Sequence, residues 1–273
     1  YVAFLTTGSL APADNNNAFD AYVRDLQTGL TTLASLSSSG SIGQTDIVGC
    51  TISPDGSFVT FSARSGNYVS GDTNSSMDVF VRDLILGTTE RVSIGYAGQG
   101  NSHSYRATVS NGGRYVAFSS IATNLVADDT NDLADIFLRD RLLGVTTLVS
   151  VSTSGAQGSG GCELYPRISY DGRYIAFGSS SNLVSGARSI FIRDVLSGIT
   201  SSPHVGSAGA FGNDAAGEVA LSGNGSRTVY YSRATNLVNS AQWPYYGDIY
   251  LRDAALSNTT LISRRDYFVD DGY

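Results

Sequence analysis

Lysine is absent from this 273-residue chain, and the 17 basic residues, all of them arginine, are outnumbered by 24 acidic residues. The formal net charge is −7, and the arginines do not form a cluster. Nucleic-acid binding requires clustered cations that neutralise phosphates, so we expect no nucleic-acid partner. No apolar run approaches the ~20 residues that a membrane-spanning helix requires, so we also expect no membrane span.

Cysteine is scarce as well, with only Cys50 and Cys162. They fall at different positions of the repeat that organises the chain, and a disulfide needs Cα atoms within ~7 Å of each other. We therefore expect two separate buried thiols. The lack of lysine and the many Ser, Thr and Gly residues are typical of a secreted bacterial protein, so we expect an extracellular or periplasmic location.

What the chain does contain is a repeated hexapeptide that ends in Arg-Asp. Its five copies occupy residues 20–25, 78–83, 135–140, 189–194 and 248–253. Their arginines are 58, 57, 54 and 59 residues apart. A period of this length predicts five copies of one supersecondary unit.

The third copy shows the unit most clearly. Runs rich in β-branched and aromatic residues occupy 105–110, 114–119, 135–140 and 145–150, with Gly, Asn and Asp between them. Such runs predict antiparallel strands, and no helical periodicity is present. Four antiparallel strands repeated radially make a β-propeller blade. We therefore predict an all-β fold in which residues 1–273 form a single five-bladed β-propeller domain with four strands per blade.

The hexapeptide is predicted to be the third strand of each unit. Side chains alternate across a strand, so Val79 and Val81 face one way while Phe80 and Arg82 face the other. Bulky residues on both faces are expected for a strand between two neighbouring sheets. Arg82 and Asp83 are adjacent and cannot face each other, so we interpret the repeated Arg-Asp pair as structural, forming contacts between blades.

A glycine closes the predicted turn between the first two strands of each unit. The turns are Pro54-Asp55-Gly56, Asn111-Gly112-Gly113, Tyr170-Asp171-Gly172, Gly223-Asn224-Gly225 and Asp270-Asp271-Gly272. Glycine supplies the positive φ that tight hairpins require.

Two stretches resemble the TolB-type bacterial propeller repeat. They are Ser53-Pro54-Asp55-Gly56 and Ser169-Tyr170-Asp171-Gly172-Arg173-Tyr174-Ile175-Ala176-Phe177, and the Arg-Asp-Leu…Gly-x-Thr endings are similar too. The resemblance covers essentially the whole chain. It implies a propeller fold but leaves the function open, because such propellers serve as scaffolds, binding modules and occasionally enzymes.

The long, variable loops are the expected place for a ligand. In a blade of this type they share one face, because they follow the second strand or lead into the next first strand. The ligand-binding candidates on or near them are Asp46, His103, Arg106, Glu163, Tyr165, Glu218, Trp243, Tyr245 and Tyr246. The last three aromatic residues suit sugar stacking and suit packing of a long loop equally well, so both interpretations stay open.

Three of these loops share the spacing Asp-x-Asn-x-x-x-Asp. They contain Asp14/Asn16/Asp20, Asp72/Asn74/Asp78 and Asp129/Asn131/Asp135. Oxygen ligands at such positions suit Ca²⁺, but Asp and Asn also cap turns by bonding to nearby backbone amides. Each loop offers only three side chains and no bidentate glutamate follows. Turn-capping is therefore favoured, and any calcium would be structural.

Hydrolysis is the main rival to ligand binding, because some five-bladed propellers are glycosidases that use paired carboxylates. The chain has three glutamates, Glu90, Glu163 and Glu218, and lacks a nucleophile elbow, a zincin helix and a histidine cluster. We therefore expect a secreted, non-enzymatic binding module for a glycan or protein ligand. The alternatives are a carbohydrate-active glycoside hydrolase or lyase at the channel mouth and a structural subunit of a surface assembly.

The two ends of the sequence are predicted to share one blade. Tyr1-Val2-Ala3-Phe4 matches Tyr115-Val116-Ala117-Phe118, the second strand of the third unit, and 270–272 supplies the turn that precedes such a strand. The C-terminal segment would then add the innermost strand, around 268–270, to the N-terminal blade. This pairing would remove the exposed edge of an open sheet.

Overall fold

The computed structural model describes residues 1–64, 66–162, 165–187, 189–239 and 247–263. In these ranges the chain forms 21 β-strands and one short 3₁₀ turn, Asn111–Gly113, so the all-β prediction is confirmed. The strands build six antiparallel sheets. No helix in the described ranges has the length and apolar character to span a membrane.

Five of the sheets follow one another along the chain, and in each the strand order follows the sequence. Sheet 1 contains β1 (Val2–Thr6), β2 (Asp20–Arg24) and β3 (Thr31–Leu33). Sheet 2 contains β4 (Cys50–Ile52), β5 (Phe58–Ala63), β6 (Asp78–Asp83) and β7 (Thr88–Arg91). Sheet 3 contains β10 (Ser104–Val109), β11 (Tyr115–Ser120), β12 (Asp135–Asp140) and β13 (Val145–Leu148).

Sheet 4 contains β14 (Arg167–Ile168), β15 (Tyr174–Ser179), β16 (Ser189–Asp194) and β17 (Ile199–Ser201). Sheet 5 contains β18 (Ala216–Leu221), β19 (Arg227–Ser232), β20 (Asp248–Asp253) and β21 (Asn258–Leu261). The sixth sheet is the hairpin of β8 (Ile94–Gly95) and β9 (Gly98–Gln99), between sheets 2 and 3. The predicted four-stranded unit is thus found in sheets 2 to 5.

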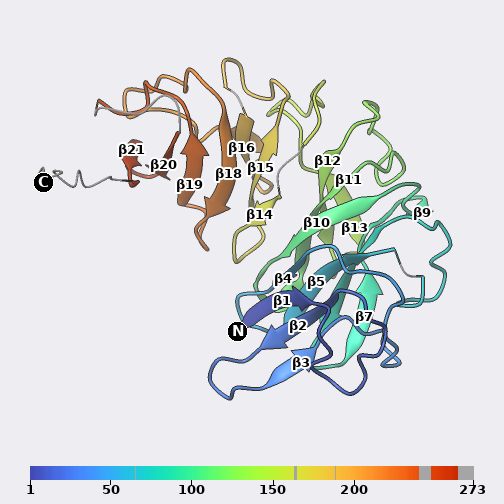
Figure 1. Cartoon of the computed structure of the whole chain (residues 1–273). Coiled ribbons are helices and arrows are strands. Elements are labelled where there is room, and N and C mark those ends of the chain that lie inside the picture. The colour runs from blue at the N-terminus through green and yellow to red at the C-terminus, as the bar shows by residue number, and fades with distance from the viewer. Residues whose placement is uncertain (65, 163–164, 188, 240–246, 264–273) are drawn as a thin grey trace, which may run out of the picture.

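Each sheet packs against the next one along the chain. The first strands β4, β10 and β18 contact strands of the preceding sheet, and β14 contacts β10 and β11. The sheets therefore follow an arc with sheets 1 and 5 at its two ends (Figure 1). Sheet 1 has three strands among the described residues, and the segment predicted to complete it, 268–270, lies outside them.

The third strand of each unit lies between two apolar layers, as its sequence predicts. Val79, Phe80 and Val81 of β6 are all fully buried. Val79 and Val81 pack against Phe118 of sheet 3, whereas Phe80 packs on its other face with Phe61 of its own sheet. Burial of two alternating faces explains why the three residues after the first aspartate of the hexapeptide are all apolar.

The repeated Arg-Asp pair is structural. Nη1 of Arg82 donates to the carbonyl of Ser37, in the loop after sheet 1, at 2.8 Å. Asp83 points the other way, and its Oδ1 accepts the backbone N–H groups of Ile85 and Leu86 at 2.8 Å. One residue therefore links neighbouring sheets while the next caps a turn.

The arginine contact does not repeat in every sheet. Arg193 of sheet 4 donates to the carbonyl of Ser152, in the loop after sheet 3, at 3.1 Å. Arg139 of sheet 3 instead donates to Gly144 of its own turn at 2.9 Å. The predicted contacts between units are therefore confirmed for sheets 2 and 4.

Candidate ligand-binding pocket

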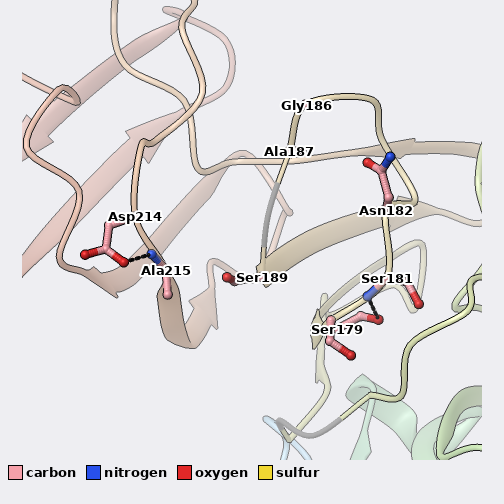
Figure 2. A pocket seen from close by; sticks show the side chains of 9 residues that line it. Ser179, Ser181, Asn182, Gly186, Ala187, Ser189, Asp214 and Ala215 are labelled. Carbon is pink, nitrogen blue, oxygen red and sulfur yellow. Dashed lines mark hydrogen bonds between the residues drawn. The ribbon is translucent and has the colours of Figure 1, made fainter.

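A polar pocket opens between the loop that follows β15 and the segment that leads into β18. It has a volume of about 540 Å³. Its lining, called here the serine pocket, consists of Ser179, Ser180, Ser181, Asn182, Gly186, Ala187, Ser189, Asp214 and Ala215. Figure 2 shows Asp214 and Ala215 on one side, Ser179 and Ser181 on the other, and Ser189 between them. Both lining segments belong to the loop types predicted to bind a ligand.

The serine pocket lies where sheet 4 departs from the repeat. Fourteen residues, 121–134, connect β11 to β12 in sheet 3, but only nine, 180–188, connect β15 to β16 in sheet 4. Ser189 also replaces the aspartate that begins the third strand in the other four sheets, for example Asp135. A shorter loop and a smaller side chain thus coincide with the pocket.

Asn182 offers the pocket an amide that bonds to none of the described residues. Its counterpart in sheet 3, Asn124, accepts the N–H of Asn101 and donates to the carbonyl of Gln99, both at 2.8 Å. Asn236 of sheet 5 is held in the same way. Asn182 is exposed, and no hydrogen bond to another described residue holds its side chain.

The serine hydroxyls differ in how far they are committed to the fold. Oγ of Ser181 donates to the carbonyl of Gly160 at 2.5 Å and accepts its N–H at 2.8 Å. Oγ of Ser179 donates to the carbonyl of Gly161 at 3.2 Å. Oγ of Ser189 has no hydrogen-bond partner among the described residues, and its backbone has a φ of 70°, in the strained left-handed region. Ser189 can therefore bond to a ligand.

Among the described residues of the lining, Asp214 is the one with a titratable side chain. Its Oδ1 accepts the N–H of Ala215 at 2.6 Å, and Nη2 of Arg233 lies 3.7 Å away. Both charged side chains are 49% exposed, so this ion pair contributes little energy and leaves the carboxylate open to a ligand. Hydroxyls, one amide and one carboxylate suit a hydroxyl-rich ligand, whereas glycoside hydrolysis uses two carboxylates.

A second group of predicted residues lies on the first strands. Gly49, Arg106 and Glu218 occupy the same position of the repeat and have φ values of 79°, 57° and 41°. In sheets 3 and 5 this position interrupts the strand register as a β-bulge. A left-handed backbone costs roughly 1–2 kcal/mol for a residue with a side chain, so the fold holds Arg106 and Glu218 under strain.

Tyr165 joins two of these positions. The guanidinium carbon of Arg106 lies 5.2 Å from the ring centre of Tyr165, and that of Arg167 lies 5.9 Å away. A Cβ added to Gly49 would lie 3.8 Å from the hydroxyl oxygen of Tyr165. The structure thus brings together Gly49, Arg106 and Tyr165. Glu218 lines a separate hollow of about 220 Å³ with Arg167.

Asp46 and His103 link neighbouring sheets. Oδ1 of Asp46 accepts the N–H of Phe19 at 2.8 Å, and Nδ1 of His103 accepts the N–H of Met77 at 2.9 Å. Phe19 and Met77 each precede the third strand of the preceding sheet. A role of Asp46 and His103 in ligand binding stays a prediction. Four other candidates lie outside the described residues: Glu163, Trp243, Tyr245 and Tyr246.

The asparagines of the three Asp-x-Asn loops form the predicted turn caps. Asn16, Asn74 and Asn131 each accept the N–H two residues later, at 2.8 to 2.9 Å. Each also donates to a carbonyl of the loop after the same sheet, at 2.8 to 3.1 Å. Within the described ranges no three His, Cys, Asp or Glu side chains gather as a metal-binding group. Calcium therefore stays a prediction.

The sequence did not identify the serine pocket itself. None of Asn182, Ser189 and Asp214 is among the residues that the sequence predicts to bind a ligand. The available signal was the loss of the Asp-x-Asn spacing in the fourth unit, together with its shorter loop. That signal marks a difference between units, but it does not show which distant segment faces the space.

Comparison of the structure with solved proteins identifies the fold. TolB from Acinetobacter baumannii superposes with a TM-score of 0.52 at 15% identity over 89% of this chain and 48% of its own. A TolB from Agrobacterium tumefaciens gives a TM-score of 0.54 at 18% identity over 89% and 73% of the two chains. An oligogalacturonate lyase in complex with manganese gives a TM-score of 0.51 at 16% identity. The match covers 89% of this chain and 58% of the lyase.

These similarities establish a TolB-like β-propeller fold, as the sequence resemblance implied. The chain spans about half the length of the Acinetobacter baumannii protein, and the identities are too low to carry an activity across. The sequence matches no protein-family model and no curated protein. Function must therefore be argued from the site.

Proposed function

We propose that this chain, which has a TolB-like β-propeller fold, is a secreted, non-enzymatic module that binds a glycan in the serine pocket. The observation that carries the proposal is a set of polar groups in one cavity that remain open to a ligand: the Asn182 amide, the Ser189 hydroxyl and the half-exposed Asp214 carboxylate. Ligand sites present a few converging polar groups that fix orientation, and sugar hydroxyls pair with groups of this kind. The place of action would be extracellular or periplasmic.

Binding is tested with a glycan array followed by calorimetry on the glycans retained. Asn182→Ala should weaken binding at least tenfold while leaving thermal stability unchanged, because the Asn182 side chain makes no contact that the fold needs. Asn124→Ala is the matched control: it should lower stability, since Asn124 is bonded at both ends, but should leave affinity unchanged. Equal affinity in Asn182→Ala and the wild type would overturn the proposal.

A hydrolase or lyase remains the second candidate because Glu218 is held on a strained backbone beside Arg167. It would require turnover of an oligosaccharide that Glu218→Gln abolishes. Binding without turnover, unaffected by Glu218→Gln, would leave the serine pocket as the site. Retention of no glycan at all would favour a protein ligand or a structural subunit.

We also propose that the fold is a closed five-bladed propeller, completed in sheet 1 by the segment 268–270. Among the described strands, β1 pairs only with β2, while sheets 2 to 5 each have a further strand at this inner edge. The turn motif at 270–272 runs in register with Tyr1 if the two ends are joined.

Closure is tested by a circular permutant that joins residue 273 directly to residue 1. Its new ends would lie at Gly155, where the turn has open space around it. The permutant should melt at or above the wild-type temperature, because the junction would reproduce an ordinary turn and second strand. Strong destabilisation, or a dimer in place of a monomer, would show that the segment does not close its own chain.

A further inference from the structure

The three Asp-x-Asn loops are equivalent in sequence but not in how their carboxylates are satisfied. In each, the second aspartate begins the third strand and accepts a serine hydroxyl through Oδ1: Asp20 from Ser35, Asp78 from Ser93 and Asp135 from Ser150. All three aspartates are buried, with at most 1% of their surface exposed. The difference between the loops lies in what faces the other oxygen, Oδ2.

In sheet 3 a glutamine donates hydrogen bonds to both aspartates of the loop, Asp129 and Asp135. Nε2 of Gln157 donates to Oδ1 of Asp129 at 2.8 Å and to Oδ2 of Asp135 at 2.9 Å. Gln157 comes from the loop after sheet 3, where it pairs with Val151 across a β-bridge. The buried carboxylate of this loop therefore has donors on both oxygens.

In sheet 2 an arginine faces the pair. Nη1 of Arg91 lies 3.3 Å from Oδ1 of Asp72 and 3.8 Å from Oδ2 of Asp78, and both carboxylates are at most 3% exposed. Gln99 donates to Oδ1 of Asp72 at 2.8 Å. Arg91 stands opposite Phe80, at the register position that Leu148 occupies opposite Phe137 in sheet 3. A positive charge of the chain itself thus lies against this buried acidic pair.

Sheet 1 has neither the glutamine nor the arginine at the equivalent positions. Leu33 occupies the position of Arg91, opposite Tyr22, and Ile42 occupies the position of Gln99 and Gln157. Tyr22, which replaces a phenylalanine, donates its hydroxyl to Oδ2 of Asp14 at 2.5 Å. Oδ2 of Asp20, like Oδ2 of Asp78 in sheet 2, is buried and accepts no hydrogen bond from the described residues, but Asp20 forms no ion pair with a described arginine.

A buried carboxylate oxygen that accepts no hydrogen bond is unfavourable, and Oδ2 of Asp20 is such an oxygen. The uncompensated oxygen lies in a loop that also carries Asp14 and the amide oxygen of Asn16. Oxygen donors of this type suit a hard cation such as Ca²⁺, with water and backbone oxygens completing the six to eight ligands that it takes.

We propose that the loop of Asp14, Asn16 and Asp20 in sheet 1 binds a single calcium ion, and that the equivalent loops of sheets 2 and 3 do not. The cation would take the place that Arg91 fills in sheet 2 and the glutamine amide fills in sheet 3. The ion would be structural, and it would secure the loop of the one sheet that has three described strands.

Calorimetry on metal-stripped protein with calcium chloride tests the proposal. One calcium ion should bind per chain, and binding should raise the melting temperature. Asp20→Asn, which keeps the side-chain shape, should abolish both effects. Absence of calcium binding at millimolar calcium would overturn the proposal and indicate a protonated Asp20 instead. A stoichiometry of three would overturn it in favour of equivalent sites.

Exchanging the residues that face the carboxylates between sheets gives control variants in which Asp14, Asn16 and Asp20 are all kept. Ile42→Gln should bring the sheet 3 amide into sheet 1 and eliminate calcium binding although Asp14, Asn16 and Asp20 are intact. Arg91→Leu combined with Gln99→Ile should give sheet 2 the leucine and isoleucine of sheet 1 and raise the stoichiometry from one to two. An unchanged stoichiometry in both variants, each folded by circular dichroism, would contradict the proposal.

Discussion

The glycine of one turn lies against an aromatic ring of the preceding sheet: a Cβ added to Gly172 would be 2.2 Å from Cδ2 of Tyr115. The same contact recurs between Gly56 and Tyr1, and between Gly225 and Tyr174. These glycines also have positive φ, as their turns require. Glycine at this position therefore serves two purposes, since it permits the turn and lets the ring of the neighbouring sheet approach.

Gly172→Ala should destabilise the protein by roughly 2–4 kcal/mol, because a left-handed alanine costs about 1–2 kcal/mol and the clash with the ring adds an overpacking cost of similar size. Gly155→Ala is the matched control, since Gly155 has a φ of 84° but nothing within 4 Å of the added Cβ. Gly155→Ala should lower the free energy of unfolding only by the cost of the left-handed alanine backbone, about 1–2 kcal/mol. Urea unfolding measures both variants, and equal losses would refute the role of the ring contact.

Ser93→Ala should destabilise the protein by roughly 2–3 kcal/mol, because it removes the hydroxyl that donates to buried Asp78 at 2.5 Å and accepts the N–H of Val79 at 3.1 Å. In sheet 4 His204 takes the position of Ser93, and Ser202, two residues earlier, serves as a comparison whose partner is uncharged. Ser202→Ala should cost only about 1 kcal/mol, since its hydroxyl donates to the carbonyl of Ile190 rather than to a charge. Chemical unfolding at pH 7 compares them, and a larger loss in Ser202→Ala would contradict this account.

Acid should destabilise the protein in part through Asp194. Arg173 donates to both carboxylate oxygens of Asp194, at 2.9 and 2.7 Å, and this holds the pKa of Asp194 well below its usual value of 3.8. A carboxylate whose pKa is lower in the folded state stabilises the fold above pH ~4, and that stability is lost as the pH falls through the folded-state pKa. Asp194→Asn should therefore show a smaller difference in unfolding free energy between pH 7 and pH 2.5 than the wild type. An identical pH dependence would count against the pair, whose partial exposure limits its contribution.

Both cysteines should be unreactive until the protein unfolds. Cys50 and Cys162 are separate free thiols, as the sequence predicted, but only Cys162 is fully buried, and Cys50 is partly exposed. Burial raises the pKa of Cys50 to about 11 and that of Cys162 to about 12. The thiolate is the nucleophile, so neither should react with iodoacetamide at pH 8 in the native state. Mass spectrometry should find two alkylated cysteines in denaturant and none without it. Fast native labelling of Cys162, which is 1% exposed, would show that sheet 4 opens readily.

The sequence by itself determined the local structure and the repeat. The strands at 78–83 and 135–140 could be predicted because the alternation of side chains and the turn glycines act over a few residues. The opposite directions of Arg82 and Asp83 followed from the same alternation. The fold then resembled known propellers because identical units must bury the same faces against each other.

Only the tertiary structure decided which equivalent residues differ in role. Asp46 and His103 occupy one position of the repeat and were candidates for a ligand, yet each accepts a backbone N–H of the preceding sheet. Likewise, three loops with the same Asp-x-Asn spacing face a glutamine, an arginine or neither. The residues that decide this, such as Arg91 and Gln157, lie on other elements and carry no signal in the loop itself.

The serine pocket depended most on tertiary structure. Ser189 and Asp214 belong to different units, and the space between them exists because one loop is shorter than its counterparts. A sequence shows that residues are missing from a loop but not what surrounds the space that they leave. Hydrogen bonds and cavities depend on distances between segments that are remote in the chain, whereas strands and turns depend on neighbours, and this is why the fold was predictable and the site was not.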